Sequence, residues 1–338
     1  MLETKMLGTD EASIEEAARL IIAGEVVGIP TETVYGLGAD ALNEEAVRKI
    51  FAAKGRPADN PLIVHVSSFE EITPLVSEIP ELAKKCAEKF WPGPLTMIMP
   101  KSDRIPMVTS GGLNTVGIRM PSNKTARAII KTSGCPIAAP SANISGSPSP
   151  TTAQHVFNDM DGRIPAIVDD GACGVGVEST VISFEGNSIR LLRPGFISVE
   201  DLKEVCDDVK IDKGVLEMLE ESAKVSSPGM KYKHYAPKAE VTILDGSSED
   251  FRRYCKEHSD KNDVLMIFDK NDCDGLSQKI IELGGTSEEQ AQRLFDALRS
   301  LDVMGAEKAY VRCPEKDGIG LAVYNRLLRA AAFRVIKL

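Results

Sequence analysis

Four polar side chains between residues 54 and 65 are suited to holding an anion. Lys54 and Arg56 close a helical pattern, Asn60 follows within the next turn of chain, and His65 lies on the next apolar segment. Cations near a helix C-terminus also offset the helix macrodipole, and for either residue alone this simpler interpretation is favoured. Two prolines stiffen the loop, however, and a stiff loop that carries cations and an amide can bind an anion. The segment is therefore a candidate anion site.

A second polar group is the run APSANISGSPSP, residues 139–150. Side chains alternate along an extended strand, so Ser141 and Asn143 would face one side, where both could donate hydrogen bonds to phosphate oxygens. Composition alone favours an ordinary serine-rich loop, with Ser145, Ser147 and Ser149 as its other polar members. Both interpretations stay open at this point.

Two single arginines interrupt apolar segments, Arg119 in VGIRMP and Arg193 in LLRPG. Arginine is rarely buried unless it pairs with a carboxylate or a bound anion. Each residue is therefore expected in an internal ion pair or in a ligand contact. The glycines at positions 171, 174 and 176 predict a tight turn rather than a phosphate site.

The composition is that of a globular protein and argues against several other classes. A hydrophobic fraction of 43% and a charged fraction of 27% fit a chain that folds independently, and no apolar run reaches the roughly 20 residues of a membrane helix. Seven scattered cysteines without a C-x-x-C pair argue against a disulfide framework and a zinc site. The net charge of −10 argues against tight, nonspecific tRNA binding. The N-terminus carries no secretion-signal pattern, so a cytoplasmic protein without membrane contact is expected.

Helical and strand patterns intermix along residues 1–205, which predicts an α/β or α+β domain. A helix is expected over residues 13–23, capped by Ser13 with Glu16, and another at 44–55, stopped by Gly55. The segment VVGIPTETVYGL predicts a strand interrupted at Pro30. Further helices are expected near residues 80–90, 123–133 and 151–159, and strands at PLIVHV, LTMIMP, TVGIRMP, PIAAPS, AIVDDG and STVISF.

The chain of 338 residues is long enough for two domains. Residues 206–238 are predicted as a linker, because SSPGMKYKHYAP breaks regular structure after a charged helical stretch. Residues 239–338 contain three short apolar strands, EVTIL, DVLMIF and KAYVRC, separated by helical segments such as EEQAQRLFDALRSLD. This order predicts a small parallel βαβ-type sheet.

The motifs coincide, in order, with those of a known enzyme family. PTETVYGLG, KGRPADNPLIVHV, WPGPLT, VGIRMPSN, APSANISG, GVESTVI and LLRPG resemble the threonylcarbamoyl-AMP synthases over roughly residues 10–200. This part is similar to their YrdC-like catalytic domain, and the linker with residues 239–338 is similar to the longer, two-domain form of the enzyme. The resemblance implies a twisted α/β domain with a concave, positively charged active-site face and a smaller, Rossmann-like parallel α/β domain. The last hundred residues match only in architecture.

The resemblance also implies an activity, that of a nucleotidyltransferase. L-Threonine, bicarbonate or CO2, and ATP would react to give threonylcarbamoyl-AMP and pyrophosphate, for threonylcarbamoyladenosine modification of tRNA next to the anticodon. Mg²⁺ would enter with ATP rather than on protein ligands. A downstream threonylcarbamoyl transferase is the expected partner, with weak or no direct binding of tRNA.

Site residues follow from the matching motifs. The family's K-x-R and S-x-N signature around the reacting centre matches Lys54, Arg56, Ser141 and Asn143. The resemblance implies threonine contacts from Thr33, His65, Arg119, Ser179 and the backbone around Ala139, with Arg119 paired to the threonine carboxylate. It implies ATP contacts from Arg56, Asn60, Thr115, Ser141, Ser149, Arg193 and, from the linker, Tyr232. The linker would then fold over the active site as a lid.

Two other functions are compatible with the sequence. The first domain could be an RNA-binding module whose concave face reads RNA shape, although the acidic net charge argues against it. Alternatively, the C-terminal sheet could sense a nucleotide in a regulatory protein. Threonine-dependent exchange between ATP and pyrophosphate distinguishes the synthase from both.

Overall fold

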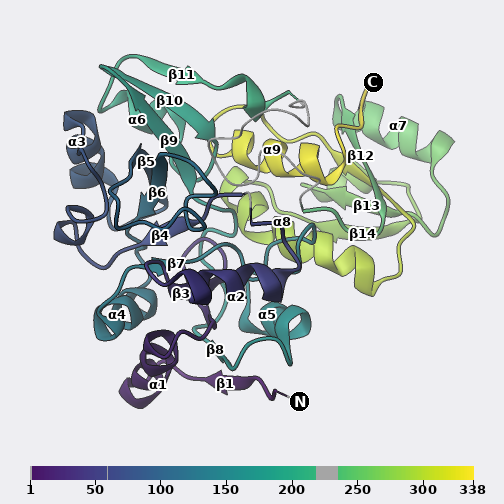
Figure 1. Ribbon diagram of the computed structural model, residues 1–338. Helices are drawn as coiled ribbons and strands as arrows, with labels where there is room; N and C mark the ends of the chain where they lie inside the picture. Colours follow the sequence, from purple (N-terminus) through teal and green to yellow (C-terminus); the bar gives the residue numbers. More distant parts are fainter. Residues whose placement is uncertain (1, 59, 218–234) are drawn as a thin grey trace.

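The computed structural model describes residues 2–58, 60–217 and 235–338, which form two sheets with their own helices (Figure 1). Within these residues the larger sheet has 11 strands in the order β1-β8-β2-β3-β7-β4-β6-β5-β9-β10-β11. It contains both parallel and antiparallel pairs, so the sheet is mixed. Its strands are β1 (Lys5–Leu7), β2 (Val27–Ile29), β3 (Gly36–Asp40), β4 (Ile63–His65), β5 (Leu95–Pro100), β6 (Thr115–Arg119), β7 (Ile137–Ala138), β8 (Ala166–Val168), β9 (Thr180–Glu185), β10 (Ser188–Arg193) and β11 (Val209–Ile211).

Helices cover both faces of the larger sheet. On one face α1 (Glu11–Ile22) and α4 (Lys124–Ser133) share an apolar cluster with β2 and β8. On the other face α2 (Glu44–Lys54), α3 (Glu81–Phe90) and α5 (Ala153–Met160) contribute to the main core, together with α6 (Val199–Lys203). Strands buried on both sides consist of nearly continuous apolar residues, as the burial of β4 and β8 shows. The sequence pattern therefore predicted these elements well.

Local signals set the ends of the helices, with one correction. α2 ends as expected, because Gly55 adopts the left-handed conformation (φ 62°) that terminates a helix without strain. α1 is not capped by Ser13 as predicted. Asp10 caps it instead, and its carboxylate accepts a hydrogen bond from the Ser13 backbone N at 3.1 Å and another from the Ser13 hydroxyl at 2.8 Å. A carboxylate at a helix N-terminus also gains from the macrodipole, which the hydroxyl does not.

The smaller sheet is parallel, as the sequence predicted. Its five strands within the described residues have the order β14-β13-β15-β12-β16. α8 and α9 cover the face towards the larger sheet and α7 covers the opposite face (Figure 1). The elements are β12 (Glu240–Asp245), α7 (Ser248–His258), β13 (Val264–Ile267), β14 (Lys279–Glu282), α8 (Ser287–Val303), β15 (Lys308–Arg312), α9 (Gly320–Ala330) and β16 (Val335–Lys337).

The two sheets are joined by an apolar contact at the loops that lead into the larger sheet. Val34 and Val177 belong to the same cluster as the inner faces of α8 and α9. The segment predicted as a linker begins with ordered structure, since β11 pairs in parallel with β10. A 3₁₀ turn lies at Lys213–Val215, within the charged stretch predicted to be helical, and residues 218–234 lie outside the described part of the chain. In the described part of the chain, no helix combines the length and apolarity needed to cross a membrane.

Candidate active site

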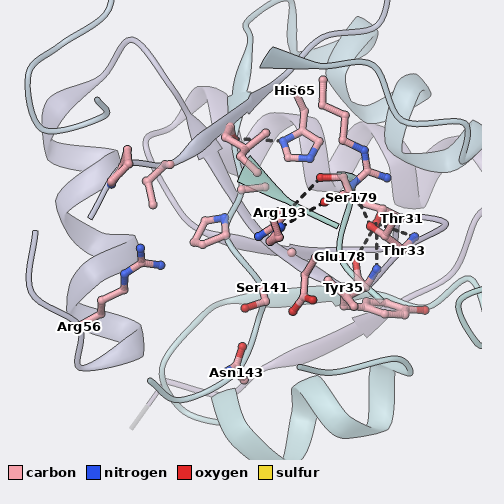
Figure 2. A pocket seen from close by; sticks show the side chains of 18 of the residues that line it. Thr31, Thr33, Tyr35, Arg56, His65, Ser141, Asn143, Glu178, Ser179 and Arg193 are labelled. Carbon is pink, nitrogen blue, oxygen red and sulfur yellow. Dashed lines mark hydrogen bonds between the residues drawn. The ribbon is translucent and has the colours of Figure 1, made fainter. Parts of the chain in front are cut away.

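A cavity with about 690 Å³ of empty space, part of it open to solvent, lies where the loops of the larger sheet meet the C-terminal helices. The β2 to β3 connection, the loop after α2, and the ends of β4, β6 and β10 all reach it (Figure 2). Sheet register brings distant residues together there, because His65 and Arg119 are direct partners in the parallel ladder of β4 and β6. The predicted site residues in its wall are Thr33, Arg56, His65, Arg119, Ala139, Ser141, Asn143, Ser179 and Arg193.

Arg119 is buried and lies in an ion pair while it also lines the cavity. Its Nη2 lies 2.6 Å from Oε1 of Glu32, and its Nη1 donates to the Thr33 hydroxyl at 2.8 Å. Burial raises the pKa of Glu32, but the charge and hydrogen bond of Arg119 outweigh this and hold it below its usual value. Of the two alternatives left open by the sequence, the ion pair is therefore present. The guanidinium and the hydroxyl together form a rigid polar corner suited to a carboxylate.

His65 is buried and neutral at physiological pH. Burial, with the nearby Arg119 charge, lowers the pKa of His65 to about 3. Its Nδ1 lies 3.2 Å from the backbone carbonyl of Ile63, which can only accept a hydrogen bond. The proton is therefore assigned to Nδ1, which leaves the lone pair on Nε2 to accept from a hydroxyl or amine.

Ser179 and Arg193 form one bonded unit in the wall between the two sheets. Arg193 donates from Nε to the Ser179 carbonyl at 3.1 Å and from Nη2 to the Ser179 hydroxyl at 3.2 Å. The Ser179 hydroxyl also lies 2.7 Å from that of Thr96, on β5. Burial lowers the pKa of Arg193 to about 10, which still leaves the guanidinium charged. The positions of both groups are thus fixed before any ligand binds.

The loop with Ser141 and Asn143 is held from behind by Lys54. Lys54 Nζ donates to the backbone carbonyl of Asn143 at 2.7 Å and to that of Ser141. Burial and then the charge of Arg56 lower the pKa of Lys54 well below its ordinary value. Figure 2 shows Arg56 on one side of the cavity and Thr33 on the other, with Ser141 and Asn143 between them.

Several predicted residues lie outside the wall of this cavity. Lys54 is 2% exposed and lies behind the loop, and Asn60 is equally buried. Thr115 begins β6 and lines a small neighbouring cavity with Pro61 and Leu62. The Ser149 hydroxyl donates to Oε1 of Glu178 at 2.5 Å. Tyr232 lies outside the described residues, so its predicted role as part of a lid remains a prediction.

Sequence reasoning missed four polar side chains of the wall, namely Thr31, Tyr35, Glu178 and Tyr235. Glu178 was inside a quoted motif, GVESTVI, and a single acid in an apolar run is itself a signal of a buried, paired carboxylate. Its main partner is Arg326 on α9, with Nε 2.9 Å from Oε2. Three arginines and one glutamate of the described chain line the cavity, so its charge suits an anionic ligand.

The fold and site define an α/β enzyme with a cationic cavity for small anionic substrates between two domains. A family model described as "Telomere recombination" matches residues 19–195. A second, described as "Threonylcarbamoyl-AMP synthase, C-terminal domain", matches residues 197–332. The chain belongs to the threonylcarbamoyl-AMP synthase family, a family of nucleotidyltransferases.

Relatives match this chain over nearly its whole length. Threonylcarbamoyl-AMP synthase of Pyrococcus abyssi is 46% identical over 332 residues, which are 97% of this chain and 96% of the relative. The enzyme of the same name from Bacillus subtilis is 45% identical over 99% of this chain and 97% of its own. The structure described as "Crystal structure of P. abyssi Sua5 complexed with L-threonine" superposes with a TM-score of 0.91, at 44% identity, over 99% of this chain and 100% of that one.

Proposed function

We propose that the chain condenses L-threonine, bicarbonate or CO2, and ATP into threonylcarbamoyl-AMP and pyrophosphate. One observation carries the proposal, namely a single cavity with an arginine, hydroxyl and neutral-histidine corner at one side and Arg56 with the Ser141 to Asn143 loop at the other (Figure 2). The two halves match the two kinds of substrate, an amino acid and a nucleotide. The P. abyssi relative is described as complexed with L-threonine, which supports threonine as one of the substrates.

Threonine binds at the corner formed by Arg119, Thr33 and His65. The guanidinium of Arg119 receives the threonine carboxylate, since it already points its Nη1 at the cavity-lining Thr33. Nε2 of His65 accepts from the threonine hydroxyl or amine, and Ser179 with the backbone at Ala139 closes the corner. A neutral histidine is required here, because an imidazolium would repel the ammonium group of the incoming amino acid.

Chemistry then proceeds in two bond-forming steps. The ammonium group of threonine first loses a proton to solvent; the neutral amine nitrogen then attacks the carbon of CO2 and loses a second proton to solvent, which gives a carbamate. A carbamate oxygen next attacks the α-phosphorus of ATP in line, and the bond to the pyrophosphate oxygen breaks. Arg56, Ser141 and Arg193 offset the charge that grows on the phosphate oxygens. Arg193 and the backbone of the Ser141 loop are held in place in advance, so they need not rearrange during the reaction. Asn143 supports this loop, because its amide nitrogen donates to the carbonyls of Ile144 and Ser147.

ATP would enter as its Mg²⁺ complex, in which the ion would supply charge neutralisation on the pyrophosphate. Within the described residues, no group of three or more His, Cys, Asp or Glu side chains is placed to hold a metal. The triphosphate and water would supply most of the ligands of the ion, which is usual for Mg²⁺ bound with a nucleotide.

The product is a labile mixed anhydride that serves tRNA modification. We therefore propose that a downstream threonylcarbamoyl transferase takes it over directly, in the cytoplasm where tRNA is available, with weak or no binding of tRNA to this chain. Its net charge of −10 supports the last point.

Release of pyrophosphate by Arg56→Ala tests the proposal. The variant is expected to lose threonine-dependent pyrophosphate release by about 100-fold or more, as for other preorganised groups that face a phosphate, while its melting temperature stays close to the parent's. Arg48→Ala is the matched control, because Arg48 lies on α2, the helix that precedes the Arg56 loop, in an exposed pair with Glu44. Unchanged release in Arg56→Ala, or release that does not depend on threonine in the parent, would refute the assignment.

A further inference from the structure

We propose that Arg326 of the C-terminal domain is a positioning residue for the nucleotide half of the active site. It would act by neutralising Glu178, so that this carboxylate neither opposes the ATP phosphates nor draws Arg193 away from them. The inference rests on the proposed function, because the role of Arg326 is defined by the binding of ATP. It would give the C-terminal domain a direct part in the reaction.

Arg326 is fully buried, and apart from a bond to its neighbour Asn325 its hydrogen bonds reach Glu178 and the residue after Arg193. Its Nε donates to Oε2 of Glu178 at 2.9 Å, and its Nη2 to the Glu178 carbonyl at 3.3 Å. Nη1 donates to the carbonyl of Pro194 at 2.6 Å, next to Arg193. One side chain from α9 thus joins the backbone on both sides of the bonded unit of Ser179 and Arg193. Its guanidinium carbon also lies 6.0 Å from the ring centroid of Tyr235, which lines the same cavity.

Glu178 is the carboxylate that needs this partner. It lines the cavity, and Figure 2 shows it between Arg193 and Ser141. Burial raises its pKa, but Arg326, Arg193 and the Ser149 hydroxyl outweigh this and hold the pKa below its ordinary value. The group is therefore a buried anion in the wall of a cavity that takes a triphosphate. Without a cation behind it, its charge would oppose the phosphates at close range.

Because Arg326 pairs with Glu178, the charge of Arg193 can act on the ligand rather than on this carboxylate. It interacts electrostatically with both Glu178 and Arg326, and it is oriented by Ser179, the neighbour of Glu178 in the chain. If Arg326 were removed, Arg193 would become the nearest strong partner of the Glu178 carboxylate. The nucleotide half would lose both a favourable charge and a preorganised donor, whereas the corner with Arg119 and Glu32 would keep its own ion pair.

Calorimetric binding of ATP and of threonine, measured separately, tests the inference in the full-length protein. Arg326→Met is expected to weaken ATP binding by about tenfold or more, while threonine binding changes less than about threefold. The decisive variant is Glu178→Gln with Arg326→Met, which removes the buried anion as well as its partner. It is expected to recover ATP binding to within about threefold of the parent. Arg326→Lys, which keeps the charge, is expected to bind ATP better than Arg326→Met.

A purely structural role predicts a different pattern. Arg299→Met is the matched control, since Arg299 on α8 also joins the domains, through Asp159 of α5 at 2.8 Å, and does not line the cavity. It should lower the melting temperature without changing the ratio of ATP to threonine affinity. Equal losses of affinity for both ligands in Arg326→Met, or no recovery of ATP binding in the double variant, would overturn the inference.

If Arg326→Met does not fold, the double variant and Arg326→Lys decide between the same outcomes. Failure of the parent to release pyrophosphate while it still binds ATP would refute the proposed function but not this inference.

Discussion

Lys54 at the end of α2 donates from Nζ to the backbone carbonyl of Asn143, 2.7 Å away and 89 residues further along the chain. A second bond reaches the carbonyl of Ser141. Both acceptors are main-chain atoms, so the ammonium group sets the course of the loop while the Ser141 side chain still lines the cavity. The Asn143 amide nitrogen instead donates to the carbonyls of Ile144 and Ser147, at 2.8 Å each, and so helps to hold the loop. The helix thus determines where the predicted phosphate donors lie.

Replacing Lys54 by methionine tests this link. Lys54→Met keeps the length of the side chain but removes two charge-assisted bonds, each of about 1.5 to 3 kcal/mol. We expect kcat/KM for ATP to fall by roughly 100-fold, about 2.7 kcal/mol, in steady-state pyrophosphate release. Lys49→Met is the control, because Lys49 lies on the same helix in a surface pair with Glu25. A Lys54→Met enzyme with the parent's kcat/KM would show that the loop does not depend on this side chain.

The ion pair of Arg119 and Glu32 should make stability respond to threonine. Glu32→Ala leaves a buried guanidinium without its carboxylate, which costs about 3 to 5 kcal/mol of unfolding free energy. A bound threonine carboxylate would restore part of this, so the threonine-induced rise in melting temperature is expected to be larger in the variant than in the parent. Glu25→Ala, which breaks an exposed pair, should change stability by less than about 1 kcal/mol. An equal or smaller threonine effect in Glu32→Ala would place the threonine carboxylate elsewhere.

His65 should make stability depend on pH. Its pKa in the folded protein is about 3, below the ordinary 6.5, so between these values the unfolded chain binds more protons than the folded one. Stability is therefore lost as pH falls from 6.5 towards 3, at up to about 1.4 kcal/mol per pH unit. In His65→Gln this contribution is absent. Urea unfolding at several pH values should give a shallower loss in the variant, and identical slopes would contradict a buried neutral histidine.

Elements with a local stop signal were predictable from the sequence. α2 ends at Gly55 because glycine adopts the left-handed conformation that terminates a helix, and the interruption at Pro30 separates β2 from β3. The prediction that Ser13 caps α1 was wrong because Asp10 and Ser13 are both good caps and the carboxylate is the stronger one here. β14 was missed because its residues are mostly exposed and form no buried apolar run.

The site was predictable only where a motif carried it. His65, Arg119 and Ser141 lie in motifs and reach the cavity as expected. The pair of Glu178 and Arg326 spans 148 positions of the chain, and no local spacing connects the two residues. A sequence can indicate that each of these charged residues lies in a segment too apolar for it to stay unpaired. Which partner it takes is decided by how the two domains pack together.

That packing depends on Gly176. Its φ is +83°, and a Cβ added there would lie 2.3 Å from the Cα of Gln292 on α8. Its backbone N also donates to the carbonyl of Thr33 at 3.1 Å, so the contact between domains directly supports the threonine corner. The glycine-rich turn predicted from sequence therefore serves close approach of two backbones, and it does not line the cavity.

Gly176→Ala should accordingly weaken both the interface and the site. The added methyl group meets backbone atoms that cannot rotate away, and the left-handed conformation adds strain, so unfolding free energy is expected to fall by about 3 kcal/mol or more. The KM for threonine should rise with it, because Thr33 follows the displaced turn. Gly174→Ala is the matched control two residues earlier, where an added Cβ meets nothing within 4 Å, and its stability should stay within about 0.5 kcal/mol of the parent. Denaturant unfolding measures the free energy of unfolding, and pyrophosphate release at several threonine concentrations measures the KM. If the two alanine variants are equally stable, α8 does not rest on this turn in solution.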